Sequence, residues 1–254
     1  MILKRRLLGI DVEEYWFDHE RYRRSTASVV CLRTAAPEPL YDCLLPEKTL
    51  AVDLSRTEEE LLRNVYPRFR SYVRNLDGTY LLRTANTAAD RDLFFTHYLP
   101  FARERRIPVP DPGEEGSLEI YLAFGASGGL LQGTAFLPLH EAGVYRYRYG
   151  VTIERTHANV LIFWQALCAA RKRGYRWFDL GGFAEKPGKG SALTGINEFK
   201  SRFGGAERDI YFYIRSPRQP LRMMLRLFGR LLANKAIYRL AARRLTHGGL
   251  DADE

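Results

Sequence analysis

The sequence is poor in cysteine and contains no long apolar run. Its three cysteines, Cys31, Cys43 and Cys168, form no CxxC pair and lack zinc-type histidine spacing. We therefore expect no disulfide framework and no metal site, and sparse cysteine is typical of the reducing cytoplasm. No stretch reaches the roughly 18 apolar residues that a membrane span needs. The basic N-terminus is followed by no signal-peptide segment.

Positive charge outweighs negative charge. The 254 residues include 39 lysines and arginines against 30 acidic residues, which gives a net charge of +9. This excess favours an anionic partner, either nucleic acid, a phosphorylated substrate or an anionic membrane, although basic surfaces also serve solubility alone. With 46% hydrophobic residues, the chain has enough apolar material for one domain of about 200 residues with appendages.

The hydrophobic periodicity predicts alternating strands and helices after residue 26, whereas residues 1–26 show no clean period. Thr57 and Glu60 have the spacing of a capping box, which predicts a helix start. Residues 145–149 alternate tyrosine and arginine, so we expect a strand with one aromatic and one basic face. The predicted strands are 27–33, 49–54, 79–84, 117–124, 129–139, 144–153, 175–180 and 209–215. The predicted longer helices are 67–75, 88–106, 158–173, 193–203 and 220–245.

Residues 159–205 are the most informative part of the chain. An apolar helix leads into a buried strand that ends in FDLGG, and a short helix then carries FKSRFGG. This arrangement resembles the C-terminal half of a GNAT-fold acyltransferase. More narrowly, it resembles the Fem-type (FemABX-like) aminoacyltransferases and the BioF2-like acyltransferases.

The resemblance implies an α/β GNAT fold, with a mixed, mostly antiparallel sheet flanked by helices. We expect an N-terminal extension in residues 1–46, the GNAT-like domain in residues 47–215 and a basic helical tail in residues 216–254. Typical Fem proteins carry two such domains, whereas this sequence contains no internal repeat and predicts one.

The sequence lacks the phosphate-binding turn of ordinary GNAT enzymes. Those enzymes hold the pyrophosphate of acetyl-CoA on a glycine-rich turn that opens the helix after the fourth strand. Here the same junction, residues 154–163, reads ERTHANVLIF and contains no glycine. This absence argues against tight binding of coenzyme A and favours another donor, since Fem-type enzymes also lack the turn and use aminoacyl-tRNA.

The resemblance assigns catalytic roles to three residues. Lys200, in the Phe-Lys pair with Phe199, corresponds to the lysine thought to stabilise the oxyanion; a surface lysine is the alternative. Asp179 either orients a substrate amine or Lys200, or caps the turn at Gly181 and Gly182. Glu154 is a candidate base. The substrate-binding candidates are Arg68, Arg70, Arg74, Asn159, Phe199, Gly181 and Gly182.

Several of these candidates have structural alternatives. Arg68, Arg70 and Arg74 match a basic helix of the family and are candidates for holding phosphates, or they form a solvated face. Asn159 is interpreted mainly as a helix cap. The glycine- and lysine-rich residues 185–191 are either a substrate lid or a plain loop. The glycines are expected to permit close backbone approach.

The resemblance implies an enzyme without a cofactor that moves an aminoacyl group from aminoacyl-tRNA to an amine of a cell-envelope or sugar-peptide precursor. The first alternative is an N-acyltransferase that uses acyl-CoA or acyl carrier protein in polysaccharide or lipid synthesis. The second is a non-catalytic binding module. The basic amphipathic tail, residues 220–245, either packs on the domain, lies on an anionic membrane or contacts RNA. We expect a cytoplasmic protein, peripheral to the membrane if the tail binds lipid.

Overall fold

The computed structural model describes residues 2–7, 9–76, 78–105, 107, 109–110, 112–182 and 192–232. The chain divides into two compact units. The smaller comprises Met1–Glu47, Pro110–Glu115 and Asp209–Glu254, and the larger comprises Lys48–Val109 and Gly116–Arg208. Two long strands, β4 (Cys43–Asp53) and β10 (Ala206–Arg215), have residues in both units.

The larger unit is a mixed, mostly antiparallel sheet flanked by helices. Its strands lie in the order β4-β9-β8-β7-β6-β5, and all neighbours are antiparallel except β8 and β9, which are parallel. The further strands are β5 (Leu81–Thr84), β6 (Glu119–Phe124), β7 (Leu130–Leu139), β8 (Val144–Thr152) and β9 (Trp177–Gly182). The helices are α2 (Glu58–Asn64), α3 (Pro67–Asn75), α4 (Ala88–Arg105), α6 (Ala158–Lys172) and α7 (Ala192–Ser201), with a short 3₁₀ turn, η1 (His140–Ala142).

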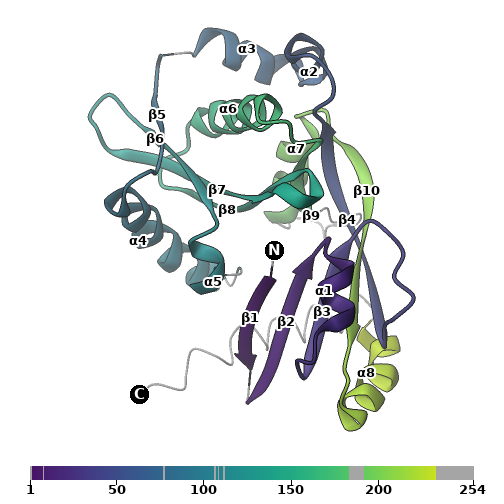
Figure 1. The fold of residues 1–254 in the computed structure, drawn as a ribbon. Helices are drawn as coiled ribbons and strands as arrows, with labels where there is room; N and C mark the ends of the chain where they lie inside the picture. The colour runs from purple at the N-terminus through teal and green to yellow at the C-terminus, as the bar shows by residue number, and fades with distance from the viewer. Residues whose placement is uncertain are drawn as a thin grey trace. The chain divides into compact units, whose positions relative to one another are not determined.

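Helices cover both faces of this sheet. Figure 1 shows α6 and α4 on opposite sides of β6, β7 and β8. Alternation along the strands explains the two layers, because successive side chains point to opposite faces. Phe136 belongs to the core beneath α6. On the other face of the sheet, Gly133 has no side chain and leaves room for Phe94 of α4. The main core therefore lies between α6 and the sheet, next to α7.

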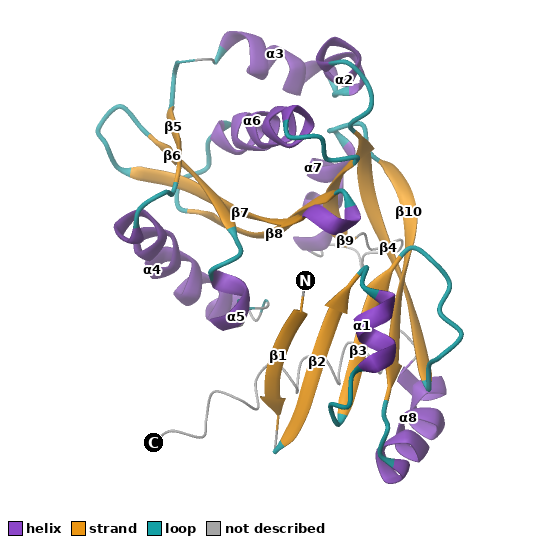
Figure 2. Ribbon diagram, in the orientation of Figure 1, coloured by secondary structure: helices purple, strands orange, loops and turns teal. Residues whose placement is uncertain are grey.

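The smaller unit has its own sheet. Its strands lie in the order β1-β2-β3-β10-β4, with β1 (Ile2–Leu7), β2 (Ile10–Trp16) and β3 (Val29–Thr34). The helices of this unit, drawn in Figure 2, are α1 (His19–Arg24), α5 (Pro112–Glu115) and α8 (Gln219–Leu232). Tyr22 of α1 packs with Tyr213, whereas Leu225 of α8 packs with Phe212 and Ile214. Because these β10 residues alternate, α1 and α8 cover opposite faces of the sheet.

Most predicted elements are present, and the exceptions lie near the ends of the chain. The helix start at Thr57 is confirmed, including both hydrogen bonds of its capping box with Glu60. Residues 1–26, for which no regular element was predicted, form β1, β2 and α1, and β4 begins at Cys43 rather than at residue 49. Residues 185–191 and 233–245 lie outside the described part of the chain. Within the described residues, no helix is long and apolar enough to cross a membrane.

Candidate active site at the end of β9

A buried ion pair joins the parallel strands β8 and β9. Arg146 and Asp179 stand opposite each other in the strand register, and the arginine Nη1 donates to the aspartate Oδ2 at 2.5 Å. The other oxygen, Oδ1, accepts a hydrogen bond from the Thr49 hydroxyl and one from the Gly181 backbone N–H at 2.7 Å. Both carboxylate oxygens are thus engaged, so Asp179 is fixed in place and holds the backbone at Gly181, which the structure places within β9 rather than in a turn after it.

Gly181 allows a lysine to lie close to the backbone near the end of β9. Its φ is +80°, a left-handed conformation that favours glycine. A Cβ atom at this position would lie 3.3 Å from the Tyr147 carbonyl oxygen and 3.6 Å from Lys200 Nζ. A side chain here would therefore both strain the backbone and crowd the lysine.

Lys200 of α7 adds a second cation to this site, beside Arg146. Its side chain is buried, with the residue 6% exposed, and its Nζ donates to the Gly182 carbonyl at 2.8 Å. Nζ also lies 5.7 Å from the centre of the Tyr147 ring. Burial lowers the pKa of Lys200 to about 8; the charge of Arg146 acts in the same direction and that of Asp179 opposes it. An ammonium group carries three N–H donors, and the bond to Gly182 uses one of them.

The aromatic residues around Lys200 hold α7 against the core. Phe199 packs on Phe69, Phe163 and Phe203, with ring centroids 5.6, 5.2 and 5.3 Å apart respectively. These contacts join α3, α6 and α7. The structure therefore places Phe199, a substrate-binding candidate from the sequence, in a hydrophobic cluster.

The start of α6 differs from the expectation for Asn159. The helix begins at Ala158 with His157 at the N-cap position, so the interpretation of Asn159 as the cap is wrong. Asn159 lies within the first turn, and its side-chain Oδ1 accepts a hydrogen bond from the Thr134 hydroxyl at 2.9 Å. The His157 ring stacks on Tyr72 at 4.0 Å between centroids. The helix N-terminus is thus flanked by an aromatic pair instead of a glycine-rich turn.

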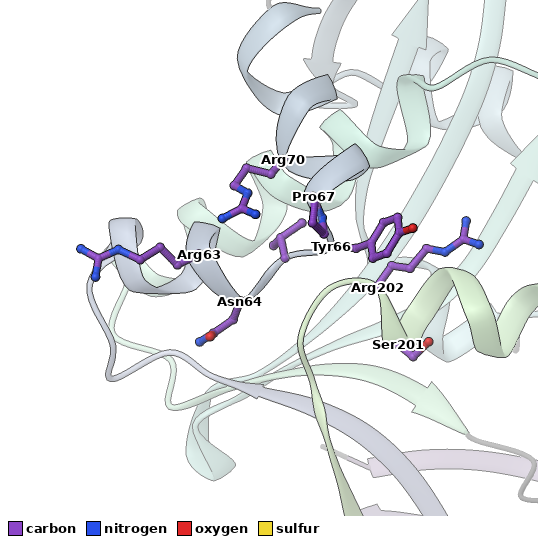
Figure 3. Close-up of a pocket in the computed structure, with 8 residues that line it drawn as sticks. Arg63, Asn64, Tyr66, Pro67, Arg70, Ser201 and Arg202 are labelled. Atoms are coloured by element: carbon purple, nitrogen blue, oxygen red, sulfur yellow. The ribbon is translucent and has the colours of Figure 1, made fainter.

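A basic pocket lies at the junction of α2, α3 and the end of α7 (Figure 3). Its volume is about 550 Å³. Figure 3 shows Tyr66 and Arg202 side by side, and the Arg202 guanidinium lies 5.5 Å from the centre of the Tyr66 ring. The lining residues are Arg63, Asn64, Val65, Tyr66, Pro67, Arg70, Ser201 and Arg202.

The structure separates the three arginines of α3. Arg70 is half-buried and lines the basic pocket. Arg68 donates from Nε to the Tyr72 hydroxyl at 2.5 Å, and Arg74 is exposed beyond the pocket. The three side chains thus do not form one binding group, and Arg70 alone combines partial burial with a pocket.

Glu154 lies apart from Lys200 and Asp179. It is exposed and follows the end of β8. Since a strand rises about 3.3 Å per residue, the path along β8 from Arg146 to the end of the strand at Thr152 spans roughly 20 Å, and Glu154 lies two residues beyond it. The structure therefore brings Lys200, Asp179, Gly181 and Gly182 together, and adds Arg146, Thr49 and Tyr147. The tyrosine–arginine alternation was the one sequence signal for Arg146, but it predicted a basic face rather than a buried ion pair.

Solved structures identify the fold. No protein-family model matches the sequence, and no curated protein matches it. The crystal structure of FemX is similar over 89% of this chain and 86% of that chain, with a TM-score of 0.62 and 13% identity. The structure of L-PGS from Bacillus licheniformis matches 92% of this chain and 86% of that one, with a TM-score of 0.54 and 13% identity.

A third structure supports the same fold. It is the C-terminal domain (DUF2156) of a putative lysylphosphatidylglycerol synthetase from Agrobacterium fabrum, which matches 91% of this chain and 84% of that chain. Its TM-score is 0.51 and its identity is 12%. The chain therefore has the Fem-like GNAT fold that the sequence predicted, and at these identities the likeness concerns the fold alone.

Proposed function

We propose that this protein is an N-acyltransferase of the Fem-like GNAT type. In this proposal it transfers an aminoacyl group from charged tRNA to an amine of a cell-envelope or sugar-peptide precursor. The observation that supports the proposal most directly is Lys200, a buried cation held against Gly182 at the end of β9. The cytoplasm, where charged tRNA is available, is the compartment that this donor implies.

The proposed reaction needs a cation at the carbonyl oxygen. The acceptor amine attacks the ester carbonyl carbon, a C–N bond forms, and the carbonyl oxygen becomes an oxyanion. Collapse of this intermediate breaks the ester C–O bond, and the tRNA hydroxyl leaves with the proton that the amine loses. In our proposal Lys200 donates hydrogen bonds to the oxyanion, where one such donor contributes roughly 3 kcal/mol to lowering the barrier.

Asp179 serves as a positioning residue in this proposal. Its oxygens accept hydrogen bonds from Arg146, Thr49 and Gly181, so it holds the end of β9 and compensates part of the positive charge near Lys200. Glu154, the base expected from the sequence, lies apart from Lys200, so this proposal gives it no role in the transfer.

The basic pocket is the proposed site for donor phosphates. Arg70 and Arg202 line it, and guanidinium groups form paired hydrogen bonds with phosphate. The adjacent N-terminus of α3 has no side-chain cap, which also favours an anion. Arg70→Gln should raise the donor KM about tenfold with little change in kcat. Arg74→Gln, on the same helix but outside the pocket, is the matched control and should leave KM unchanged.

Replacement of Lys200 tests the catalytic role. Lys200→Ala should lower kcat about 100-fold or more, the usual effect of removing one oxyanion donor, while circular dichroism shows a folded protein. Lys172→Ala, an exposed lysine on α6, is the control and should keep wild-type activity. A kcat of Lys200→Ala within a few-fold of wild type would exclude Lys200 from the mechanism. Mass spectrometry of products formed from aminoacyl-tRNA, acyl-CoA and acyl carrier protein donors would identify the donor.

A further inference from the structure

Helix α8 is fixed to the smaller unit along one side. Leu225 packs against the core cluster that contains Phe212 and Ile214. Asp42, whose side chain is 5% exposed, accepts a hydrogen bond from Arg226 Nε at 2.9 Å and lies 3.7 Å from Arg222 Nε. A buried carboxylate and an apolar contact together set the rotation of the helix about its own axis.

This rotation turns three large apolar side chains outward. Met223, Met224 and Leu227 are 61%, 53% and 68% exposed respectively. At about 100° per residue, they fall within an arc of roughly 100° on the helix surface. Single exposed apolar residues are ordinary, but a contiguous group on a fixed element marks a contact surface. We call Met223, Met224 and Leu227 the apolar ridge of α8.

The charged residues of α8 are all arginines, and the acidic group that contacts two of them, Asp42, is buried beneath the helix. Arg222 and Arg226 lie on the flank of α8 next to Met223, since they precede and follow it by one and three positions. From residue 216 to residue 250 the sequence contains seven arginines, one lysine and no acidic residue. A partner of the ridge must therefore combine apolar and anionic chemistry.

We propose that the apolar ridge of α8 docks on the surface of an anionic phospholipid membrane. A helix lying in the interface buries apolar side chains at the acyl boundary, and its flanking cations meet lipid phosphates. A nucleic acid would satisfy the arginines, but it would leave the two methionines and the leucine in water. This docking is separate from the acyl transfer proposed above and does not depend on it.

Vesicle sedimentation tests the proposal with the full-length protein. Wild-type protein should pellet with vesicles of phosphatidylcholine mixed with phosphatidylglycerol, and far less with phosphatidylcholine alone, and rising salt should weaken the binding. The triple variant Met223→Ser, Met224→Ser, Leu227→Ser should bind at least about tenfold more weakly. The reason is that it lacks the three apolar side chains that wild-type protein buries in the membrane interface.

A matched control comes from the other unit. Leu81 of β5 is 62% exposed, close to the 68% of Leu227, so Leu81→Ser removes one comparably exposed apolar side chain and should bind vesicles as wild type does. Lys200→Ala should also bind like wild type, which separates this proposal from the proposed function. Unchanged vesicle binding by the triple variant would overturn the proposal, as would equal binding to both vesicle types. A triple variant that loses self-association or tRNA binding but keeps its vesicle binding would also overturn the proposal. So would a triple variant that unfolds at a lower temperature and still binds vesicles.

Discussion

The charge of Lys200 is buried where water is largely excluded, and this burial lowers the free energy of unfolding by an amount that can be measured. Its pKa is lowered to about 8, below the ordinary lysine value of about 10.4. Below pH 8 the side chain is charged in the folded and the unfolded protein, so the folded state bears the full cost of burial. Between pH 8 and about 10.4 the unfolded chain binds more protons, so the free energy of unfolding contributed by Lys200 rises with pH.

Lys200→Met should therefore stabilise the protein while abolishing activity. At pH 7 we expect the variant to have a free energy of unfolding roughly 1–3 kcal/mol higher than wild type. This difference in stability should shrink as the pH rises towards 10. Urea unfolding at both pH values measures this difference. A variant less stable than wild type at pH 7 would contradict the cost assigned to the buried charge.

The same pKa predicts the pH dependence of catalysis. If Lys200 stabilises an oxyanion as an ammonium group, kcat should fall as the pH rises through about 8. Lys200→Arg, whose guanidinium stays charged, should lose this fall in whatever activity it retains. A kcat that instead rises through pH 8 would mean that the neutral amine acts as a base.

Gly181 offers a second test at the scale of one residue. Gly181→Ala should cost about 1–2 kcal/mol of stability and lower kcat, because the new methyl group meets the left-handed backbone and crowds Lys200. Gly174→Ala is the matched control, since its φ is +83° and nothing lies within 4 Å of the added Cβ. Gly174→Ala should lose similar stability and keep its kcat. A similar loss of kcat in both variants would remove the specific link between Gly181 and Lys200.

At this scale the sequence pointed to part of the candidate site, whose role stays a prediction. The FDLGG and FKSRFGG segments pointed to Asp179, the two glycines and Lys200 because they resemble a known pattern. Arg146 and Thr49 lie far from Asp179 in sequence, and only strand pairing brings them to it. Asn159 was assigned to the wrong role because helix boundaries depend on local backbone geometry, which one polar residue does not specify.

At the scale of elements, the aromatic cluster of Phe69, Phe163, Phe199 and Phe203 joins three helices to the core. Phe203 is 1% exposed, so Phe203→Ala should lower the free energy of unfolding by about 3–5 kcal/mol. Phe199→Ala should cost about half as much, because Phe199 is only partly buried. Unfolding titrations measure both values. If Phe199→Ala instead left stability unchanged and raised KM, Phe199 would be assigned to substrate binding.

The strands that sequence periodicity missed, β1 and β2, are rich in charged residues. β1 carries lysine and arginines between its apolar residues, and Lys4 pairs with Glu13 across to β2 at 3.0 Å. Such opposite-charge cross-strand pairs stabilise a sheet without apolar alternation. The inner strands β6 and β7 are largely apolar and β8 alternates tyrosine and arginine, all three between turn residues, and they were predicted within one or two residues at each end.

For the whole molecule, the choice of donor is the main prediction. The junction before α6 has no glycine-rich turn, and its helix start is flanked by the His157–Tyr72 stack. Acetyl-CoA should therefore bind no tighter than about millimolar, or about −4 kcal/mol, in isothermal titration calorimetry. A micromolar dissociation constant would contradict the aminoacyl-tRNA proposal and favour an acyl-CoA donor.

The sequence by itself determined the fold class, most helices and inner strands, the positive charge and the segment that contains Lys200. These follow from local periodicity, turn residues and a recognisable motif, all of which are properties of neighbouring positions. Tertiary structure decided the partners of Asp179, the burial that lowers the pKa of Lys200, the difference among the three α3 arginines and the outward face of α8. Each of these depends on contacts between residues distant in sequence, or on which side of an element meets the core. Strand register sets the contacts, and desolvation shifts the pKa, only once the chain has folded.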